Sequence, residues 1–276
     1  MESEFILSFL YSWLFKTKQM VRPKKHLGQH FLTDNNIAQA IVDCLDSEYS
    51  NVCEVGPGTG VLTAPLLNKK FIKNLKLIEV DKESIDYLEG NFEDDRLSII
   101  EADFLRMDID DIFTSPFALI GNFPYNISSQ IFFKVLENRN RIPLVTGMIQ
   151  KEVAERIAAP HGNKTYGILS VLLQSWYDIE YCFTVNENVF RPPPRVKSAV
   201  IRFKRNATQE LGCDEKLFFT TVKTAFNHRR KTLRNGLRPL LPNIQQSDHK
   251  FFSMRAEQLS PAQFIELTNV VEEMMD

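Results

Sequence analysis

Apolar and polar residues follow one another along most of the chain in a pattern that predicts strands and helices in regular succession. Nearly continuous apolar runs predict strands at residues 51–55, 75–80, 97–102, 117–122 and 143–149. Apolar residues at helical spacing predict helices from Asp34, from about Val61, after Asp81, and at 127–137 and 151–158. Apolar strands that alternate with helices are typical of a parallel sheet covered on both faces. The pattern therefore predicts an α/β fold.

The pattern changes after Tyr166. A further helix is expected at 167–175, and two strands are expected at 176–185 and 197–205, separated by a Pro-rich loop. Such a pair of strands can close one edge of the sheet.

A break between Asn206 and Asp214 separates this pattern from a purely helical one. The stretches 217–226 and 262–274 are amphipathic, and Ser260-Pro261 provides a cap and a first-turn residue for the second helix. We therefore predict an N-terminal extension at 1–21, a large α/β domain at 22–210 and a small all-α domain at 211–276.

The composition is that of an ordinary globular protein, with 43% hydrophobic residues and a net charge of -2. A polyanionic partner would have to be bound by local basic patches, which occur in RPKK near the start, RPPPRVK, IRFKR and HRRKTLRNGLR. Each could also be only a solvated surface, but several of them beside prolines or aromatic residues favour nucleic acid.

The cysteines are scattered, without a C-x-x-C pair or a histidine at zinc spacing, which indicates reduced thiols in a cytoplasmic protein and no metal site. The opening MESEFILSFLYSWLF lacks a basic start and a small-residue cleavage site, and it is too short to span a bilayer. We expect no membrane partner, and we interpret residues 1–19 as an addition before a natural start at Met20.

Candidate chemistry follows the predicted strands. The turn EVGPGTG comes directly after the first strand, and glycines at that place let the backbone approach a nucleotide-like ligand. Glu79 closes the second strand, where an acid accepts hydrogen bonds from ribose hydroxyls. Asp103, after the third strand, is suited to an adenine amino group. Either acid alone could be a solvated helix cap.

The charge of Glu54 bears on the identity of the ligand. A carboxylate two residues before the first glycine would repel a pyrophosphate and suits a ligand with positive charge. S-adenosylmethionine combines an adenosine with a cationic sulfonium, so we interpret the pocket as a site for this methyl donor.

The corner Asn122-Phe123-Pro124-Tyr125 ends the fourth strand, at the edge of the sheet where ligands bind in open α/β folds. If the Asn122 side-chain oxygen and the Phe123 carbonyl accept the two N–H bonds of an adenine amine, its nitrogen lone pair is directed at the donor. Tyr125 would stack on the base, and Pro124 would fix the corner. The alternative is a tight turn with buried aromatic residues.

Together these stretches resemble a known family. The leader LGQHFL, then EVGPGTGVLT, IEVD, EADF, GNFPYNISSQI, FRPPPRVKSAV and FNHRRKTLRNGL, are similar to the ribosomal RNA adenine N6,N6-dimethyltransferases, in particular their bacterial small-subunit branch. The resemblance runs from about Arg22 to the C-terminus. It implies a Rossmann-like, S-adenosylmethionine-dependent methyltransferase domain with a helical RNA-binding domain.

The resemblance also implies a reaction and a partner. The reaction is dimethylation of two adjacent adenosines in a hairpin loop near the 3' end of small-subunit (16S) rRNA, during ribosome assembly. The partner is this rRNA in a pre-30S-like particle, and we expect the enzyme to be a monomer. Donor contacts are implied at His30, Leu32, Gly56, Glu79, Asp103 and Asn122. Phe190 matches an aromatic residue that would sandwich the target base with Tyr125.

The chain departs from the family pattern at two positions. Many members have Leu in place of Phe123 and Asn in place of His30. The first difference could affect the monomethylated intermediate, and the second exchanges one polar neighbour of the donor for another. Two other functions stay open, namely a large-subunit rRNA adenine methyltransferase of the macrolide-resistance type and a non-catalytic assembly factor that binds nucleic acid.

Overall fold

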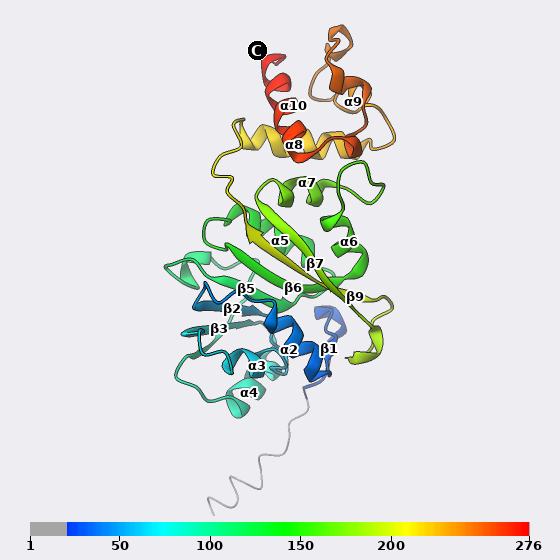
Figure 1. The fold of residues 1–276 in the computed structure, drawn as a ribbon. Coiled ribbons are helices and arrows are strands. Elements are labelled where there is room, and N and C mark those ends of the chain that lie inside the picture. Colours follow the sequence, from blue (N-terminus) through cyan, green and yellow to red (C-terminus); the bar gives the residue numbers. More distant parts are fainter. Residues whose placement is uncertain (1–20, 276) are drawn as a thin grey trace, which may run out of the picture.

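The fold is built on one mixed sheet of seven strands (Figure 1). The computed structural model describes residues 21–275, so the predictions for the segment before residue 21 lie outside the described residues. The strand order is β4-β3-β2-β5-β6-β9-β7. The strands are β2 (Asn51–Val55), β3 (Asn74–Glu79), β4 (Leu97–Glu101), β5 (Ala118–Asn122), β6 (Leu144–Gln150), β7 (Tyr177–Val185) and β9 (Ser198–Arg205).

Strands β2 to β6 are parallel to one another, whereas β9 runs antiparallel to both β6 and β7. The predicted α/β class and the edge made by the last two strands are therefore confirmed. In this arrangement the order of the parallel strands reverses between β2 and β5, and crevices at such a switch point are where open α/β sheets bind ligands.

Helices cover both faces of the sheet. They are α2 (Asn35–Asp43), α3 (Thr63–Leu67), α4 (Lys82–Asn91), α5 (Ser128–Glu137), α6 (Lys151–Ala158) and α7 (Ile168–Gln174). Alternate residues of β5 belong to different cores: Leu119 packs with α5 to α7, whereas Ala118 and Ile120 pack with α2 to α4. Both faces are thus buried, as the continuous apolar strands predicted.

Three helices begin directly after a residue whose side chain caps them. Asp34 accepts hydrogen bonds from the backbone N–H groups of Asn36 and Ile37, and Asp81 accepts one from Glu83. Ser260 forms a capping box with Gln263, followed by a proline in the first turn. Each of these caps lies where the sequence predicted a helix to begin.

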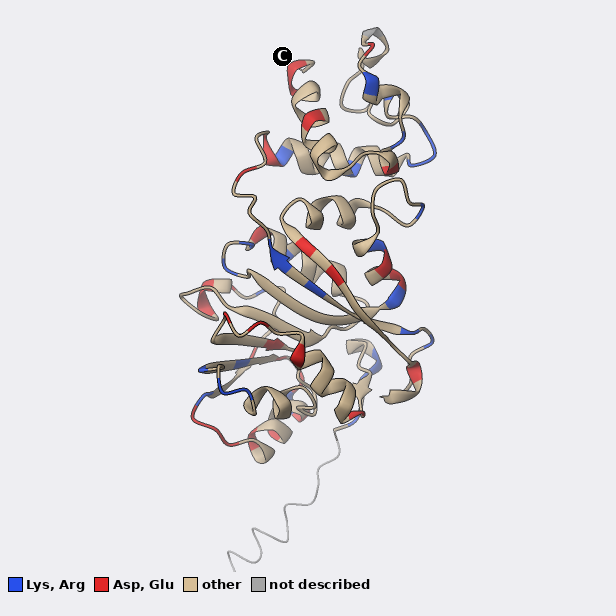
Figure 2. Cartoon of the chain, viewed as in Figure 1, with Lys and Arg blue, Asp and Glu red and all other residues tan. Residues whose placement is uncertain are grey.

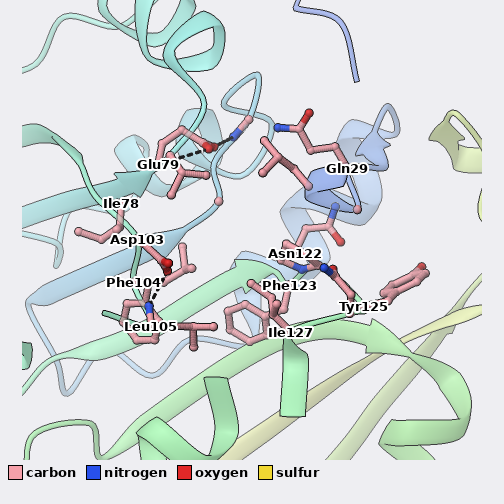
Figure 3. Close-up of a pocket in the computed structure, with 18 of the residues that line it drawn as sticks. Gln29, Ile78, Glu79, Asp103, Phe104, Leu105, Asn122, Phe123, Tyr125 and Ile127 are labelled. Atoms are coloured by element: carbon pink, nitrogen blue, oxygen red, sulfur yellow. Dashed lines mark hydrogen bonds between the residues drawn. The ribbon is translucent and has the colours of Figure 1, made fainter. Parts of the chain in front are cut away.

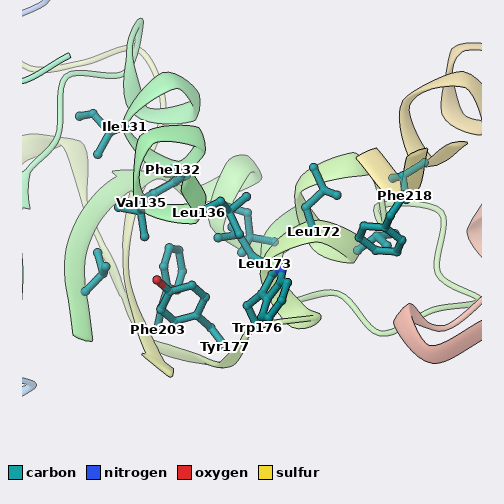
Figure 4. Packing of buried hydrophobic residues seen from close by; sticks show 14 of the residues in the cluster. Ile131, Phe132, Val135, Leu136, Leu172, Leu173, Trp176, Tyr177, Phe203 and Phe218 are labelled. Atoms are coloured by element: carbon teal, nitrogen blue, oxygen red, sulfur yellow. The ribbon is translucent and has the colours of Figure 1, made fainter. Parts of the chain in front are cut away.

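The chain after residue 210 forms helices, of which α8 and α10 pack against α7 (Figure 1). These are α8 (Glu215–Asn227), the short α9 (Leu233–Gly236) and α10 (Pro261–Glu273), joined by turns of 3-10 helix. One buried core continues from Phe132 of α5 through Leu172 and Trp176 to Phe218 of α8 (Figure 4). The helical segment is therefore packed on the sheet through shared apolar side chains, and a domain boundary near residue 210 stays a prediction.

A small two-stranded ladder was not predicted. It pairs β1 (Phe31–Leu32) with β8 (Phe190–Arg191) in antiparallel orientation. The ladder joins the basic leader to the Pro-rich loop and brings both to the carboxyl ends of the parallel strands. Among residues 21–275, no helix is long and apolar enough to cross a membrane.

Candidate active site

A cavity of about 490 Å³ lies at the carboxyl ends of β2, β3, β4 and β5 (Figure 3). This volume is in the range of sites for small organic ligands. The leader forms one side of the cavity, and the turns that follow the four strands form the rest. The lining residues are 26–31, Val55, Gly56, Gly58, 78–80, 102–106 and 122–127.

The glycine turn gives the cavity an open backbone wall. Gly56 has a backbone φ of +67°, which residues other than glycine rarely adopt. A Cβ atom built at this position would meet nothing within 4 Å. At Gly58 such an atom would lie 2.8 Å from the Phe31 ring, so the leader packs directly on the turn. The wall thus leaves room for a ligand at Gly56 and is closed by an aromatic ring next to it.

Glu79 is fixed at the end of β3 by backbone donors. One carboxylate oxygen accepts a hydrogen bond from the Gly58 N–H at 3.1 Å, and the other accepts those of Val80 and Asp81, each at 2.9 Å. Burial raises the pKa of Glu79. A carboxylate oriented in this way can accept hydrogen bonds from the hydroxyls of a bound sugar.

Asp103 lines the same cavity and lies on the same side of it as Glu79, across from Asn122 (Figure 3). It accepts a hydrogen bond from the Leu105 N–H at 2.9 Å, and the Arg106 guanidinium lies 3.4 Å from its other oxygen. Apolar side chains, among them those of Ile78 and Phe104, line the space beside it. The arrangement suits a flat heterocycle with an amino group.

The Asn122 amide is held in one orientation. Its nitrogen donates a hydrogen bond of 2.9 Å to the backbone carbonyl of His30, which can only accept, so the side-chain oxygen is the atom left for a ligand. The Phe123 N–H donates to the Met148 carbonyl at 3.0 Å and extends the β5–β6 ladder. The Phe123 carbonyl accepts none of the turn and loop hydrogen bonds found in the described residues. The corner therefore offers two acceptor oxygens.

Tyr125 and His30 form the mouth of the cavity. The Tyr125 hydroxyl lies 2.5 Å from Ser198 Oγ, and burial raises the pKa of Tyr125. Its ring stacks on the His30 ring with centroids 5.6 Å apart. His30 Nδ1 lies 2.7 Å from the Pro192 carbonyl, so this nitrogen carries the hydrogen. One histidine thus ties together the leader, the corner and the Pro-rich loop.

The structure brings most of the sequence-predicted site residues into this one cavity. His30, Gly56, Glu79, Asp103 and the corner from Asn122 to Tyr125 all line it. Leu32 and Phe190 do not, because they face each other across the β1–β8 ladder and are only 3% and 2% exposed. The Phe190 ring is buried in the core with Leu32, Met148 and Val200, so a sandwich of the target base between Phe190 and Tyr125 stays a prediction.

The argument from the charge of Glu54 was wrong. Its side chain is 1% exposed, does not line the cavity, and accepts a hydrogen bond from the Thr63 hydroxyl at 2.7 Å. Burial, opposed by that hydrogen bond and assisted by the charge of Glu79, raises the pKa of Glu54 to about 8. Sequence position alone could not reveal that this side chain turns into the core.

Several lining residues were missed. Val80 is 45% exposed although it is apolar, and it borders the cavity directly after Glu79. An exposed apolar residue beside a predicted ligand acid is a signal that was available in IEVD. Gln29 and Phe31 gave no periodic signal, because the leader is neither a regular helix nor a long strand.

Known proteins are similar to this chain in sequence and in fold. The family model described as "Ribosomal RNA adenine dimethylase" matches residues 20–273. Over 260 residues, the chain is 56% identical to a protein of Parabacteroides distasonis named ribosomal RNA small subunit methyltransferase A, covering 94% of this chain and 97% of that protein. A protein of the same name from Bacteroides thetaiotaomicron is 58% identical over 260 residues, covering 93% and 97%.

Two solved structures share the fold at lower identity. A dimethyladenosine transferase from Plasmodium falciparum superposes with a TM-score of 0.73 at 22% identity, covering 89% of this chain and 98% of that one. The 23S rRNA methyltransferase ErmE superposes with a TM-score of 0.64 at 23% identity, covering 88% and 99%. The Rossmann-like methyltransferase fold predicted from the sequence is thereby confirmed.

Proposed function

Since this chain belongs to the ribosomal RNA adenine dimethylase family, we propose that it transfers methyl groups from S-adenosylmethionine to two adjacent adenosines in a hairpin loop near the 3' end of small-subunit rRNA. The product is N6,N6-dimethyladenosine. The observation that carries the proposal is the single cavity in which the acids Glu79 and Asp103 lie opposite the oriented amide of Asn122.

The donor side of the cavity fits an adenosine that bears a methionine end. Glu79 would accept from the ribose hydroxyls, Asp103 from the adenine amine, and the open wall at Gly56 leaves space for the amino-acid end. His30 and Leu32 would contribute through the leader backbone, since Leu32 is buried. When bound, S-adenosylmethionine supplies an electrophilic methyl group, whose bond to sulfur breaks with both electrons staying on sulfur as the new N–C bond forms.

On the acceptor side, Asn122 and the Phe123 carbonyl would hold the adenine N6 amine. Its lone pair is delocalised into the ring, and two N–H bonds to fixed oxygens draw the nitrogen towards tetrahedral geometry. The amide neither gains nor loses a proton, so Asn122 orients the amine, and the displaced N–H proton leaves to solvent. Pro124 keeps the two oxygens at the cavity by fixing the corner.

The target base has to leave its stack to reach this cavity, so a loop nucleotide is the natural substrate. Tyr125 would stack on it. Phe190, the second aromatic residue expected at the base, would have to move from its buried place to join Tyr125.

Basic side chains of the Pro-rich loop, whose Pro192 carbonyl contacts the cavity residue His30, support an RNA substrate. In the described part of the chain, no ion pair is found for Arg191, Arg195 or Lys197 of the Pro-rich loop. By contrast, the predicted cluster on β9 is engaged with acids, because Arg202 and Lys204 both pair with Asp46. Figure 2 shows basic segments of β9 beside acidic segments of the neighbouring strand β7. The Pro-rich loop is therefore the better phosphate contact.

The small subunit is favoured over the large one by relatedness. The relatives at 56% and 58% identity are named as small-subunit enzymes, whereas the similarity to ErmE is 23%. We further propose that the enzyme acts as a cytoplasmic monomer on a pre-30S-like particle, and that its catalytic residues lie at 22–210 and its helical RNA-binding domain at 211–276.

Replacing Asn122 by Ala tests the function directly. Methyl transfer to immature small subunits should fall by at least about a hundredfold, because the amine loses its fixed acceptor. The calorimetric affinity for S-adenosylhomocysteine should fall by less than about tenfold, because Asn122 is only one of several donor contacts. Transfer is measured by mass spectrometry of the nucleosides.

A matched control is Asn51→Ala, which removes an asparagine from the opposite end of the neighbouring strand β2. This variant should methylate normally. Unchanged transfer by the Asn122 variant would refute the role of the corner, and absence of dimethyladenosine from the unaltered enzyme would refute the function.

A further inference from the structure

The turn that carries Asp103 is held from outside the candidate active site by a lysine of α5. The segment from Asp103 to Met107 is a single helical turn, in which the Met107 N–H donates to the Asp103 carbonyl at 3.1 Å. The Lys134 ammonium donates hydrogen bonds to the backbone carbonyls of Leu105, at 3.2 Å, and of Met107. Carbonyls at the end of a helical turn lack partners within the turn, and a lysine can supply them. Lys134 therefore closes the end of this turn.

The backbone of Leu105 connects this lysine to the acid in the cavity. Its carbonyl accepts from Lys134, and its N–H donates to the Asp103 carboxylate at 2.9 Å (Figure 3). The Lys134 ammonium also lies 5.4 Å from the centroid of the Phe104 ring, which lines the cavity between the two. The orientation of the Asp103 carboxylate thus depends on a backbone segment that Lys134 holds in place.

The outer side of the turn is open. A second cavity of about 380 Å³ lies there, between the turn and α5, and Leu105 lines both cavities. Lys134 borders this second cavity and is half-buried, and burial lowers its pKa. Because side-chain packing on this side is incomplete, the hydrogen bonds of Lys134 provide much of the restraint on the turn.

We propose that Lys134 is a positioning residue for the methyl donor, which fixes the turn from Asp103 to Met107, directs the Asp103 carboxylate at the adenine amine, and so sets the selectivity for adenine. The proposal rests on the proposed function, in which Asp103 accepts a hydrogen bond from that amine. A carboxylate accepts from the 6-amino group of adenine but repels the 6-oxygen of hypoxanthine, so its orientation determines how well the two bases are distinguished.

The experiment compares two ligands by isothermal titration calorimetry. They are S-adenosylhomocysteine and S-inosylhomocysteine, which has an oxygen in place of the adenine amine. The unaltered chain should bind the first more tightly. Lys134→Met should lower the affinity for S-adenosylhomocysteine roughly fivefold to tenfold and that for S-inosylhomocysteine far less, so that the ratio of the two affinities falls about fivefold. Lys134→Arg retains a cationic donor and should keep the ratio within about twofold of the unaltered chain.

Two further variants separate positioning from a general effect on the fold. Lys73→Met is the matched control, because Lys73 also donates to a backbone carbonyl, that of Lys70 at 3.3 Å, but precedes the other end of β3. It should leave both affinities unchanged. Asp103→Asn removes the acid itself and should abolish the preference for adenine, and adding Lys134→Met to it should not change the ratio further.

Three results would overturn the proposal: an unchanged ratio in Lys134→Met, an equal fall of the ratio in Lys73→Met, or a loss of affinity in Lys134→Met that is the same for both ligands. Thermal unfolding checks that each variant is folded, and if Lys134→Met is not, Lys134→Gln takes its place with the same criteria. A failure of the proposed function is separate, because it would appear as no dimethyladenosine from the unaltered chain, whereas the ratio of affinities is measured without RNA.

Discussion

Glu54 shows how much of the site depends on residues that no ligand touches. It lies on β2 directly before the glycine turn, and its carboxyl group bonds to Thr63 at the start of α3. Because the pKa of Glu54 is raised to about 8, the group is mostly protonated at neutral pH. It joins the strand to the following helix as a neutral hydrogen-bond partner.

This buried acid predicts a pH dependence of stability. Between the ordinary pKa of 4.5 and the folded value of about 8, the unfolded chain releases the proton while the folded chain keeps it. The contribution of Glu54 to the free energy of unfolding should therefore be fully present below pH 4.5 and fall by at most about 1.4 kcal/mol per pH unit up to pH 8. Glu54→Gln should remove this slope and be the more stable protein at pH 8.

Urea unfolding at about pH 5.5 and pH 8 measures the effect. Replacing the exposed Glu93 by Gln is the control and should leave the slope unchanged. A Glu54→Gln variant with the same pH dependence as the unaltered chain would show that the buried group is not the cause.

At the scale of elements, the leader is the part of the site that is held from outside the sheet. Asp81, whose side chain is fully buried, caps α4 and also accepts hydrogen bonds from Lys24 and Gln29. Residues 26–31, which follow Lys24 and include Gln29, line the cavity. The start of one helix thus fixes the segment that covers the candidate donor site.

Lys24→Met should loosen this segment without shortening the side chain. The affinity for S-adenosylhomocysteine is expected to fall roughly fivefold to tenfold, because the leader then closes on the ligand less often. Isothermal titration calorimetry measures the change. Lys25→Met is the matched control, since Lys25 is exposed, and equal losses in both variants would contradict the role of Asp81.

The elements that the sequence predicted are those with a long periodic signal. All five parallel strands and the two closing strands lie within a residue or two of the predicted bounds, and the predicted acids and corner follow them. The β1–β8 ladder was missed because its strands have two residues each, too few to show a period. The environments of Phe190 and Glu54 were also missed, because a motif gives chain position and not the direction of a side chain.

At the scale of the whole molecule, the net charge of -2 means that attraction to RNA depends on where the basic residues lie. From the sequence alone, the basic clusters of the Pro-rich loop and of β9 were equally good candidates for binding RNA. The structure distinguishes them, since Lys204 lies 2.8 Å from Asp46 and 3.3 Å from Glu48. By contrast, Arg195 is exposed in the Pro-rich loop, whose Pro192 carbonyl contacts the cavity residue His30.

This difference predicts two salt dependences. A protein whose basic side chains neutralise phosphates releases counterions on binding, so its affinity for the nucleic acid falls as the salt concentration rises. Each phosphate contact contributes about 0.9 to the slope of log K against log salt. Arg195→Gln should therefore reduce that slope by about one for a hairpin RNA of the small-subunit 3' end. Lys204→Gln removes the same charge, but Lys204 is paired with Asp46 and Glu48 and does not contact phosphate in this account. The slope of log K against log salt should therefore equal that of the unaltered chain within error. Fluorescence anisotropy titrations at several salt concentrations measure both slopes, and equal slopes for the two variants would mean that net charge, and not the Pro-rich loop, governs the attraction.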